Sequence, residues 1–379
     1  MDFNLDETQR ELRELAAGLL GREADRQRLE AFEKTGAPYD TAVWKALGQA
    51  GLLGVCLPEE VGGAGLGAIE LTVVLREIGA HVAPVPAYAS LALAAVPLAA
   101  HGTAAQRALL APLNEGEAVL TGAYREVGPP GEVAATARPD GDGHVLDGVK
   151  TFVPYAAEAA RILVPARVTG AGAQDGQIGV FLVEPSQVVL TPQPSATTEP
   201  LSRVELAGVR VTADALLGGA ADGAAWRTLR RSAVAGAVAL ASGVIEGALN
   251  LTTEYVKTRE QFERALAQFQ AVTMQIGDVY IAKRALDVAV WAAAWRLSED
   301  AGNGPAAGDA DEVLAIASYN ACEPVMKALY TCQHLHGGIG LDVTYPLHRY
   351  FAWGKQLGHL LGGAEDQLDT LGSLLAQEA

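Results

Sequence analysis

The sequence predicts a mostly α-helical protein with a central β domain, because the spacing of its apolar residues changes twice along the chain. Residues 1–117 carry apolar side chains at helical intervals, and residues 118–218 carry short β-type runs between Gly, Pro and Asp turns. Residues 219–379 return to long helical patterns. We therefore expect an N-terminal helical domain, an antiparallel β domain and a C-terminal helical bundle, with those boundaries.

Helices separated by turns are expected in the first segment. Its first helical pattern consists of Leu5, Leu12, Leu15, Ala16 and Leu19. The Gly-rich stretch 58–65 interrupts the pattern as a loop, and another apolar helix is expected over 69–78. After two prolines, the almost wholly apolar stretch 87–96 predicts a buried helix that ends at Pro97.

Strands are expected at four short runs of β-branched and aliphatic residues in the second segment. These runs are 144–146, 162–164, 178–183 and 188–190. In the third segment, helices are expected over 226–257, 269–297 and 313–335. The apolar run 232–245 is rich in small residues and ends at Glu246, which favours a helix buried in a bundle over a membrane span.

The charge balance argues against two classes of partner. Twenty-eight Lys and Arg face 45 Asp and Glu, a net charge of −17, which disfavours nucleic acid and an anionic membrane surface. The acidic start lacks the features of a signal peptide, and the three cysteines provide neither a disulfide framework nor a C-x-x-C pair. We expect a cytoplasmic protein.

Five segments in chain order carry a family resemblance. They are Trp44–Gly54 with Pro58–Leu66, Leu146–Val153, Val204–Gly218, Arg259–Phe262 with Phe269-Gln270, and Gly337–Gly340 with Tyr345-Pro346. Together they resemble the acyl-CoA dehydrogenase family over essentially the whole chain. The stretch 332–351 is similar to an actinobacterial branch whose members often form two-subunit enzymes. The resemblance implies an oxidoreductase of lipid metabolism, a flavoprotein that carries FAD.

The resemblance places the FAD contacts mainly in the C-terminal half. It implies contacts from Arg259, Gln261, Phe262, Leu266, Gln270, His334, Gly337, Gly338 and Gly340. An arginine suits a pyrophosphate because its planar fork can donate two hydrogen bonds at once. A glycine turn lets the backbone approach a ligand closely. Because the family binds FAD between subunits, an oligomer is implied.

Some positions depart from the family pattern. Glu263 stands where the family usually has glycine, and His334 stands where it commonly has glutamine. His334 and His336 suggest a metal pair, but no third ligand is placed and we expect no metal site. The stretch 124–129 differs from the family's flavin-contacting turn, and Pro154 has no N–H or hydroxyl to offer a flavin.

The catalytic carboxylate of the family has no counterpart at either expected position. The family's reaction needs a carboxylate that removes the α-proton of an acyl thioester. Ungapped counting places Leu361 at one base position and Ala233 at the other, and neither side chain can take a proton. Glu365 is a weak candidate for a displaced base, and its ordinary interpretation is an acidic residue at a solvated helix start.

Three hypotheses follow for the function. The first is the non-catalytic subunit of a heteromeric, FAD-dependent acyl-CoA dehydrogenase that acts on an acyl-CoA thioester. The second is a self-sufficient homo-oligomeric enzyme with a displaced base, and the third is a non-enzymatic scaffold that binds CoA or acyl groups. The resemblance implies a dimer or tetramer, homomeric or with a sister subunit, and electron-transfer flavoprotein as electron acceptor. It makes steroid side-chain or branched acyl-CoA thioesters plausible substrates.

Overall fold

The computed structural model of the chain describes residues 3–128, 131–170, 176–301 and 309–378. Two compact units are present, and they do not follow the chain order of the three expected domains. The first comprises residues 1–34, 67–83 and 234–379, and the second comprises residues 35–66 and 84–233. The three-domain division remains a prediction.

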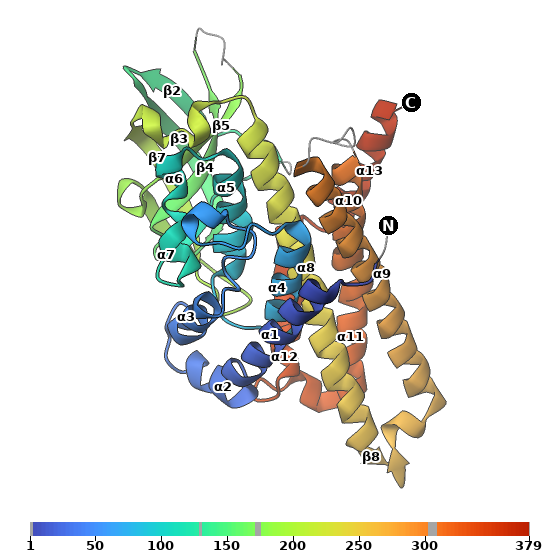
Figure 1. Cartoon of the computed structure of the whole chain (residues 1–379). Coiled ribbons are helices and arrows are strands. Elements are labelled where there is room, and N and C mark those ends of the chain that lie inside the picture. Colours follow the sequence, from blue (N-terminus) through green and yellow to red (C-terminus); the bar gives the residue numbers. More distant parts are fainter. Residues whose placement is uncertain (1–2, 129–130, 171–175, 302–308, 379) are drawn as a thin grey trace. The chain divides into compact units, whose positions relative to one another are not determined.

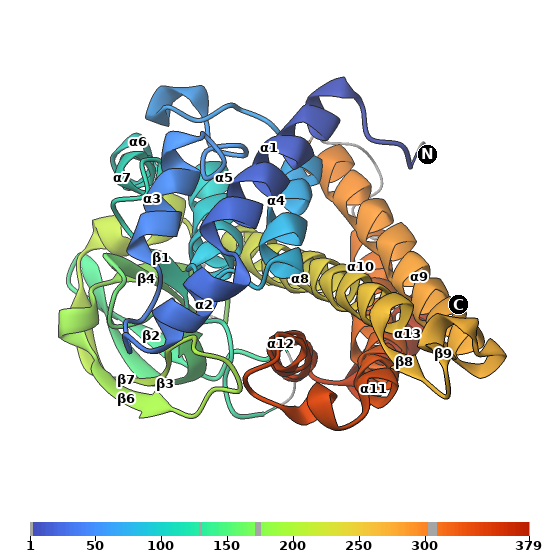
Figure 2. The same ribbon diagram turned by 90° about the horizontal axis from the view of Figure 1, so that it is seen from below.

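The first unit is a helical bundle with a small hairpin (Figure 1). Its elements are α1 (Glu7–Glu23), α2 (Arg26–Glu33), α4 (Ala68–Ala80), most of α8 (Ala224–Thr258), β8 (Glu260–Gln261), β9 (Arg264–Ala265), η6 (Leu266–Gln268), α9 (Gln270–Ala301), α10 (Asp309–Cys322), α11 (Pro324–His336), η7 (Gly337–Leu341), α12 (Leu347–Leu360) and α13 (Ala364–Glu378). In both views α9 lies along α10 and α11 (Figures 1 and 2).

Helix α8 is long and apolar enough to cross a membrane by length and composition, but 78% of its most apolar window is buried within the structure. This burial supports the expected bundle helix. Glycines allow α8 to pack tightly on α4, because a Cβ on Gly243 would lie 1.9 Å from the Arg76 carbonyl oxygen. A Cβ on Gly79 would likewise meet the Leu240 carbonyl oxygen at 2.3 Å.

Buried charges also join α4, α8 and α9. Arg76 donates to the Ser242 hydroxyl at 2.7 Å and to the Asp287 carboxylate at 3.2 Å, and it pairs with Glu246. Lys283 completes the group at 3.0 Å from Asp287. Since every one of these charges has an opposite partner, the desolvation cost of burying them is offset within the cluster.

The second unit carries the sheet and short helices. Its elements are α3 (Thr41–Gln49), η1 (Glu59–Val61), η2 (Tyr88–Ala95), α5 (Val96–His101), α6 (Ala104–Arg107), α7 (Leu110–Asn114), β1 (Leu120–Gly122), β2 (Thr136–Asp140), β3 (Gly143–Pro154), β4 (Arg161–Val168), β5 (Ile178–Val183), η3 (Pro185–Gln187), β6 (Val189–Gln193), β7 (Leu201–Val211), η4 (Ala213–Ala215), η5 (Leu217–Gly219) and the start of α8. Of these, η2 is a π-helix.

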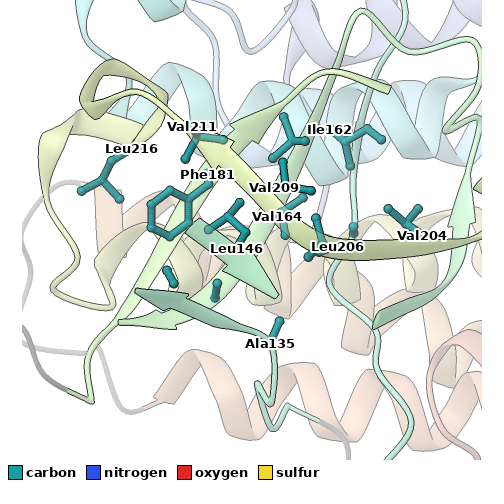
Figure 3. Close-up of a cluster of buried hydrophobic side chains, with 14 of the residues drawn as sticks. Ala135, Leu146, Ile162, Val164, Phe181, Val204, Leu206, Val209, Val211 and Leu216 are labelled. Atoms are coloured by element: carbon teal, nitrogen blue, oxygen red, sulfur yellow. The ribbon is translucent and has the colours of Figure 1, made fainter. Parts of the chain in front are cut away.

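The strands form one seven-stranded sheet in the order β1-β4-β2-β3-β7-β6, with β5 also paired to β4. The expected antiparallel pairing holds for β2–β3, β3–β7, β4–β5 and β6–β7, whereas β4 runs parallel to β1 and β2. Aliphatic side chains from five of these strands, together with the aromatic ring of Phe181, form the buried core of the sheet (Figure 3). The β-type runs that predicted the strands thus also contribute side chains to the core.

Two helix boundaries differ from the expected ones, and proline explains both. The helix expected to end at Pro97 continues as α5 to His101, since proline is tolerated in the first turn of a new helix. The helix expected over 313–335 is instead interrupted at Glu323, because Pro324 cannot continue the hydrogen-bond ladder.

Candidate functional site

The segment around Arg259 folds as a short hairpin between α8 and α9 (Figure 1). The Arg259 amide caps α8 by donating to the Tyr255 carbonyl at 2.8 Å, and the Leu266 amide donates to the Arg259 carbonyl at 2.9 Å. Gln261 pairs with Arg264 across the hairpin, and Gln270 is the first residue of α9. The two FAD motifs expected at 259–262 and 269–270 are therefore the two ends of one compact connection.

The hairpin turn requires an unusual backbone at both of its central residues. Phe262 has φ +54° and Glu263 has φ +64°, as in the two-residue type I′ turns that favour glycine and asparagine. This requirement gives a physical reason for the glycine that the family usually has where this chain has Glu263. The substitution strains the turn and places a carboxylate at its tip.

Arg259 and Phe262 present the chemistry expected of a pyrophosphate and flavin contact. The Phe262 side chain is 87% exposed, and its ring centroid lies 6.4 Å from that of Phe269. Among the described residues, no carboxylate forms an ion pair with Arg259, which is exposed. An exposed cation without an ion-pair partner and an exposed aromatic ring in the same hairpin fit an anionic, planar ligand. Gln261 and Gln270 are also exposed, and Leu266 is half-buried.

The glycine turn begins where α11 ends. Gly337 adopts φ +62°, and a Cβ on Gly337 or on Gly338 would meet nothing within 4 Å. Gly340 is different, because a Cβ there would lie 2.8 Å from the Gln333 carbonyl oxygen of its own helix. The first two glycines thus face open space, where a ligand can approach, whereas the third allows the turn to fold back on α11.

His334 and His336 lie in different environments. His334 is exposed, whereas His336 is 3% exposed and both of its ring nitrogens have protein partners. Within the described part of the chain, no group of three His, Cys, Asp or Glu side chains is placed to hold a metal ion. The two histidines therefore do not share the geometry of a metal site.

The β-domain positions that depart from the family pattern are held by structural contacts. Pro154 is buried at the end of β3, and its carbonyl accepts a hydrogen bond from the Thr121 hydroxyl at 2.7 Å. Glu126 pairs with the buried Lys150 and accepts the Ala134 amide at 2.8 Å. Burial lowers the pKa of Lys150, while the Glu126 carboxylate opposes this shift. Pro129 lies outside the described residues.

Both expected base positions are buried and apolar. Ala233 lies within α8 with no exposed surface, and Leu361 caps the end of α12. Glu365 is exposed in the first turn of α13. This placement supports the interpretation of Glu365 as a solvated residue at a helix N-terminus, which the helix dipole favours.

The sequence did not single out the contacts that join the two candidate FAD segments. Tyr255, one turn before Arg259, donates its hydroxyl to the His336 carbonyl at 3.3 Å, directly before the glycine turn. The hydroxyl of Tyr345, in the Tyr-Pro motif, lies 3.2 Å from Nε2 of the same histidine. Two sequence signals point to this contact. One is a tyrosine four residues before Arg259, and the other is a histidine directly before the glycine pair.

Comparisons with known proteins identify the relatives of this chain. Family models described as the acyl-CoA dehydrogenase N-terminal and C-terminal domains match residues 6–117 and 226–374. The chain is 35% identical to acyl-CoA dehydrogenase FadE27 of Mycobacterium tuberculosis, over 100% of this chain and 99% of that protein.

Two solved structures match over nearly their full lengths. A variant of the Tcur3481–Tcur3483 steroid ACAD has a TM-score of 0.86 at 40% identity, covering 98% of both chains. The ChsE4–ChsE5 complex from Mycobacterium tuberculosis has a TM-score of 0.90 at 33% identity, covering 99% of both. With two family models and a full-length relative in agreement, the chain belongs to the acyl-CoA dehydrogenase family.

Proposed function

We propose that this chain is the non-catalytic subunit of a heteromeric, FAD-dependent acyl-CoA dehydrogenase. The observation that carries the proposal is a contrast within the chain. Arg259, Phe262, Gly337 and Gly338, which are expected to bind FAD, are exposed, whereas both positions expected for the base hold buried apolar side chains, Ala233 and Leu361. A partner chain of the same family supplies the carboxylate.

FAD supplies the oxidant of this chemistry, since it accepts the β-hydrogen of the acyl thioester as a hydride. The role of this chain is to hold the cofactor. Arg259 donates to the pyrophosphate, Phe262 offers an apolar face, and the backbone at Gly337 and Gly338 leaves room for close approach. Gln261, Leu266, Gln270, His334 and Gly340 complete the proposed FAD-binding set. Electron-transfer flavoprotein takes up the electrons.

An apolar stripe on α9 supports assembly with another subunit. Met274, Ile281 and Val288 recur every seven residues and are 64%, 66% and 44% exposed. Residues at this spacing lie on one face of a helix, and such a stripe left in water is typical of a protein interface. Two of the similar structures are named as pairs of chains, the Tcur3481–Tcur3483 enzyme and the ChsE4–ChsE5 complex. We assign the α9 stripe to a sister acyl-CoA dehydrogenase subunit.

The substrate proposed is a steroid side-chain or branched acyl-CoA thioester. One similar structure is named a steroid ACAD, and the chain is 40% identical to it. This assignment rests on that similarity.

The test is to purify the chain alone and with a co-expressed sister chain encoded beside it. Flavin absorbance and turnover with an artificial electron acceptor are then measured on both substrate classes. We expect colour and turnover only in the complex. A yellow protein that turns over by itself would show a self-sufficient enzyme, and the absence of flavin from both preparations would show a scaffold.

Arg259→Ala in the complex tests the cofactor assignment separately. Loss of a charge-assisted contact costs about 1.5–3 kcal/mol, so the dissociation constant for FAD is expected to rise about 10- to 100-fold. Arg210→Ala is the matched control, because Arg210 is an exposed arginine on β7 that pairs with Asp140. Equal FAD affinity in the two variants would refute the pyrophosphate contact.

A further inference from the structure

His336 is the last residue of α11 and directly precedes the glycine turn. Its burial is unusual for a residue at a helix end beside two exposed glycines. A buried histidine must have its ring nitrogens satisfied, and its partners here identify the protonation state of each nitrogen.

The two ring nitrogens of His336 have different roles. Nδ1 lies 2.8 Å from the Cys332 carbonyl oxygen, which can only accept, so Nδ1 carries the hydrogen. Nε2 lies 3.2 Å from the Tyr345 hydroxyl and accepts its hydrogen bond. Burial lowers the pKa of His336, while the bond to the Cys332 carbonyl opposes this shift. A neutral ring with a free electron pair on Nε2 agrees with these contacts.

Tyr255 contacts His336 through both its ring and its hydroxyl. Its ring stacks on the imidazole with centroids 4.3 Å apart and planes 21° apart, and its hydroxyl donates to the His336 carbonyl. Tyr255 is also the residue whose carbonyl accepts the Arg259 amide, at 2.8 Å. Backbone and side-chain bonds therefore run without interruption from Arg259 through Tyr255 to the residue that precedes Gly337.

We infer that Tyr255, His336 and Tyr345 form a positioning cluster that fixes the glycine turn relative to Arg259. The inference rests on the proposed function, because both segments belong to the proposed FAD site. A ligand as long as a dinucleotide binds well only if its separate contacts are held at the right spacing before it arrives. None of the three residues needs to touch the cofactor.

Three variants, made in the complex with the sister chain, test the cluster. Tyr345→Phe removes only the bond to Nε2, Tyr255→Phe removes only the bond to the His336 carbonyl, and His336→Phe keeps the ring stacking but removes both ring bonds. We expect the FAD dissociation constant to rise about three- to tenfold for each tyrosine variant, the size of one neutral hydrogen bond, and further for His336→Phe. Tyr330→Phe is the matched control, since Tyr330 is an exposed tyrosine on the same helix.

A double-mutant cycle distinguishes positioning from simple support of the fold. Arg259→Lys keeps a measurable FAD affinity and weakens the arginine contact. If the cluster acts by placing the turn relative to Arg259, Tyr345→Phe will raise the FAD dissociation constant by a smaller factor in the Arg259→Lys background than in the native one. The melting temperature of the FAD-free complex, measured for each variant, corrects for any loss of folding.

Two results would overturn the inference. One is an unchanged FAD dissociation constant in all three cluster variants, and the other is strictly additive effects in the cycle. If Arg259→Ala weakens FAD binding while the cluster variants do not, only the cluster fails. If Arg259→Ala leaves the FAD dissociation constant unchanged, the proposed function fails together with the cluster inference.

Discussion

Glu263 occupies a left-handed backbone conformation in which a side chain is strained. Glu263→Gly relieves about 1–2 kcal/mol of this strain. The greater conformational freedom of glycine in the unfolded chain destabilises the folded protein by about 0.5–1 kcal/mol, which offsets part of that gain. A net stabilisation of up to about 1.5 kcal/mol is therefore expected. Slower hydrogen exchange of the hairpin amides in the Glu263→Gly protein is the measurement that checks it.

Glu263→Gln separates the charge of this side chain from its backbone strain. Because glutamine keeps the side chain and the positive φ, it should leave hydrogen exchange unchanged. Either substitution tightens FAD binding if the carboxylate faces the pyrophosphate. Hairpin exchange that is equally fast in the native, Glu263→Gly and Glu263→Gln proteins would contradict the strain argument.

At the residue scale, the sequence predicted a turn after a helix but not the conformation of that turn. The structure shows Arg259 and Phe262 together in one exposed hairpin, which the sequence placed only as a turn after a helix. The positive φ at Phe262 and Glu263 was not foreseen, because both residues ordinarily avoid that conformation. His336 was considered only for a metal, since the partners that bury it come from two other segments, at Tyr255 and Tyr345.

At the scale of the elements, close packing of α4 on α8 depends on the glycines Gly79 and Gly243. In α8, Gly243→Ala would place a Cβ 1.9 Å from a backbone oxygen of α4, which neither helix can relieve without moving. We expect a loss of about 1–3 kcal/mol, typical of overpacking. The change in melting temperature of the purified complex measures this loss.

Gly372→Ala is the control with the opposite sign. Gly372 is an exposed residue of α13, and a Cβ there would meet nothing within 4 Å. Alanine in an unhindered helix interior stabilises by about 0.5–1 kcal/mol relative to glycine. A destabilisation of similar size in both variants would mean that helix propensity, and not the α4–α8 contact, governs the effect.

Helix prediction was accurate for the long apolar pattern over 226–257. The helix expected over 226–257 is α8, Ala224–Thr258, because its many small apolar residues allow burial nearly all round. Periodicity did not reveal the π-helix over Tyr88–Ala95, since that stretch is apolar on every side and has no face to count. The parallel pairing of β4 was likewise missed, because pairing depends on chain segments far apart in sequence.

At the scale of the whole molecule, we propose that cofactor binding and proton removal belong to different chains. The family is established by the comparisons, whereas the division of labour between two chains is our proposal. General-base groups contribute about 100- to 10,000-fold to a rate, so removal of a true base is readily detected. In this chain the remaining candidate is Glu365, in the exposed first turn of α13.

The most direct measurement is therefore the turnover of the flavin-loaded complex carrying Glu365→Gln, with Asp369→Asn on the same helix as the control. We predict turnover within about twofold of the native complex for both variants, since in the proposed division of labour the sister chain supplies the general base. The corresponding glutamine substitution of the sister chain's carboxylate should abolish it. A loss of about 100-fold or more in Glu365→Gln, with flavin content unchanged, would show that this chain supplies the base and contradict the account.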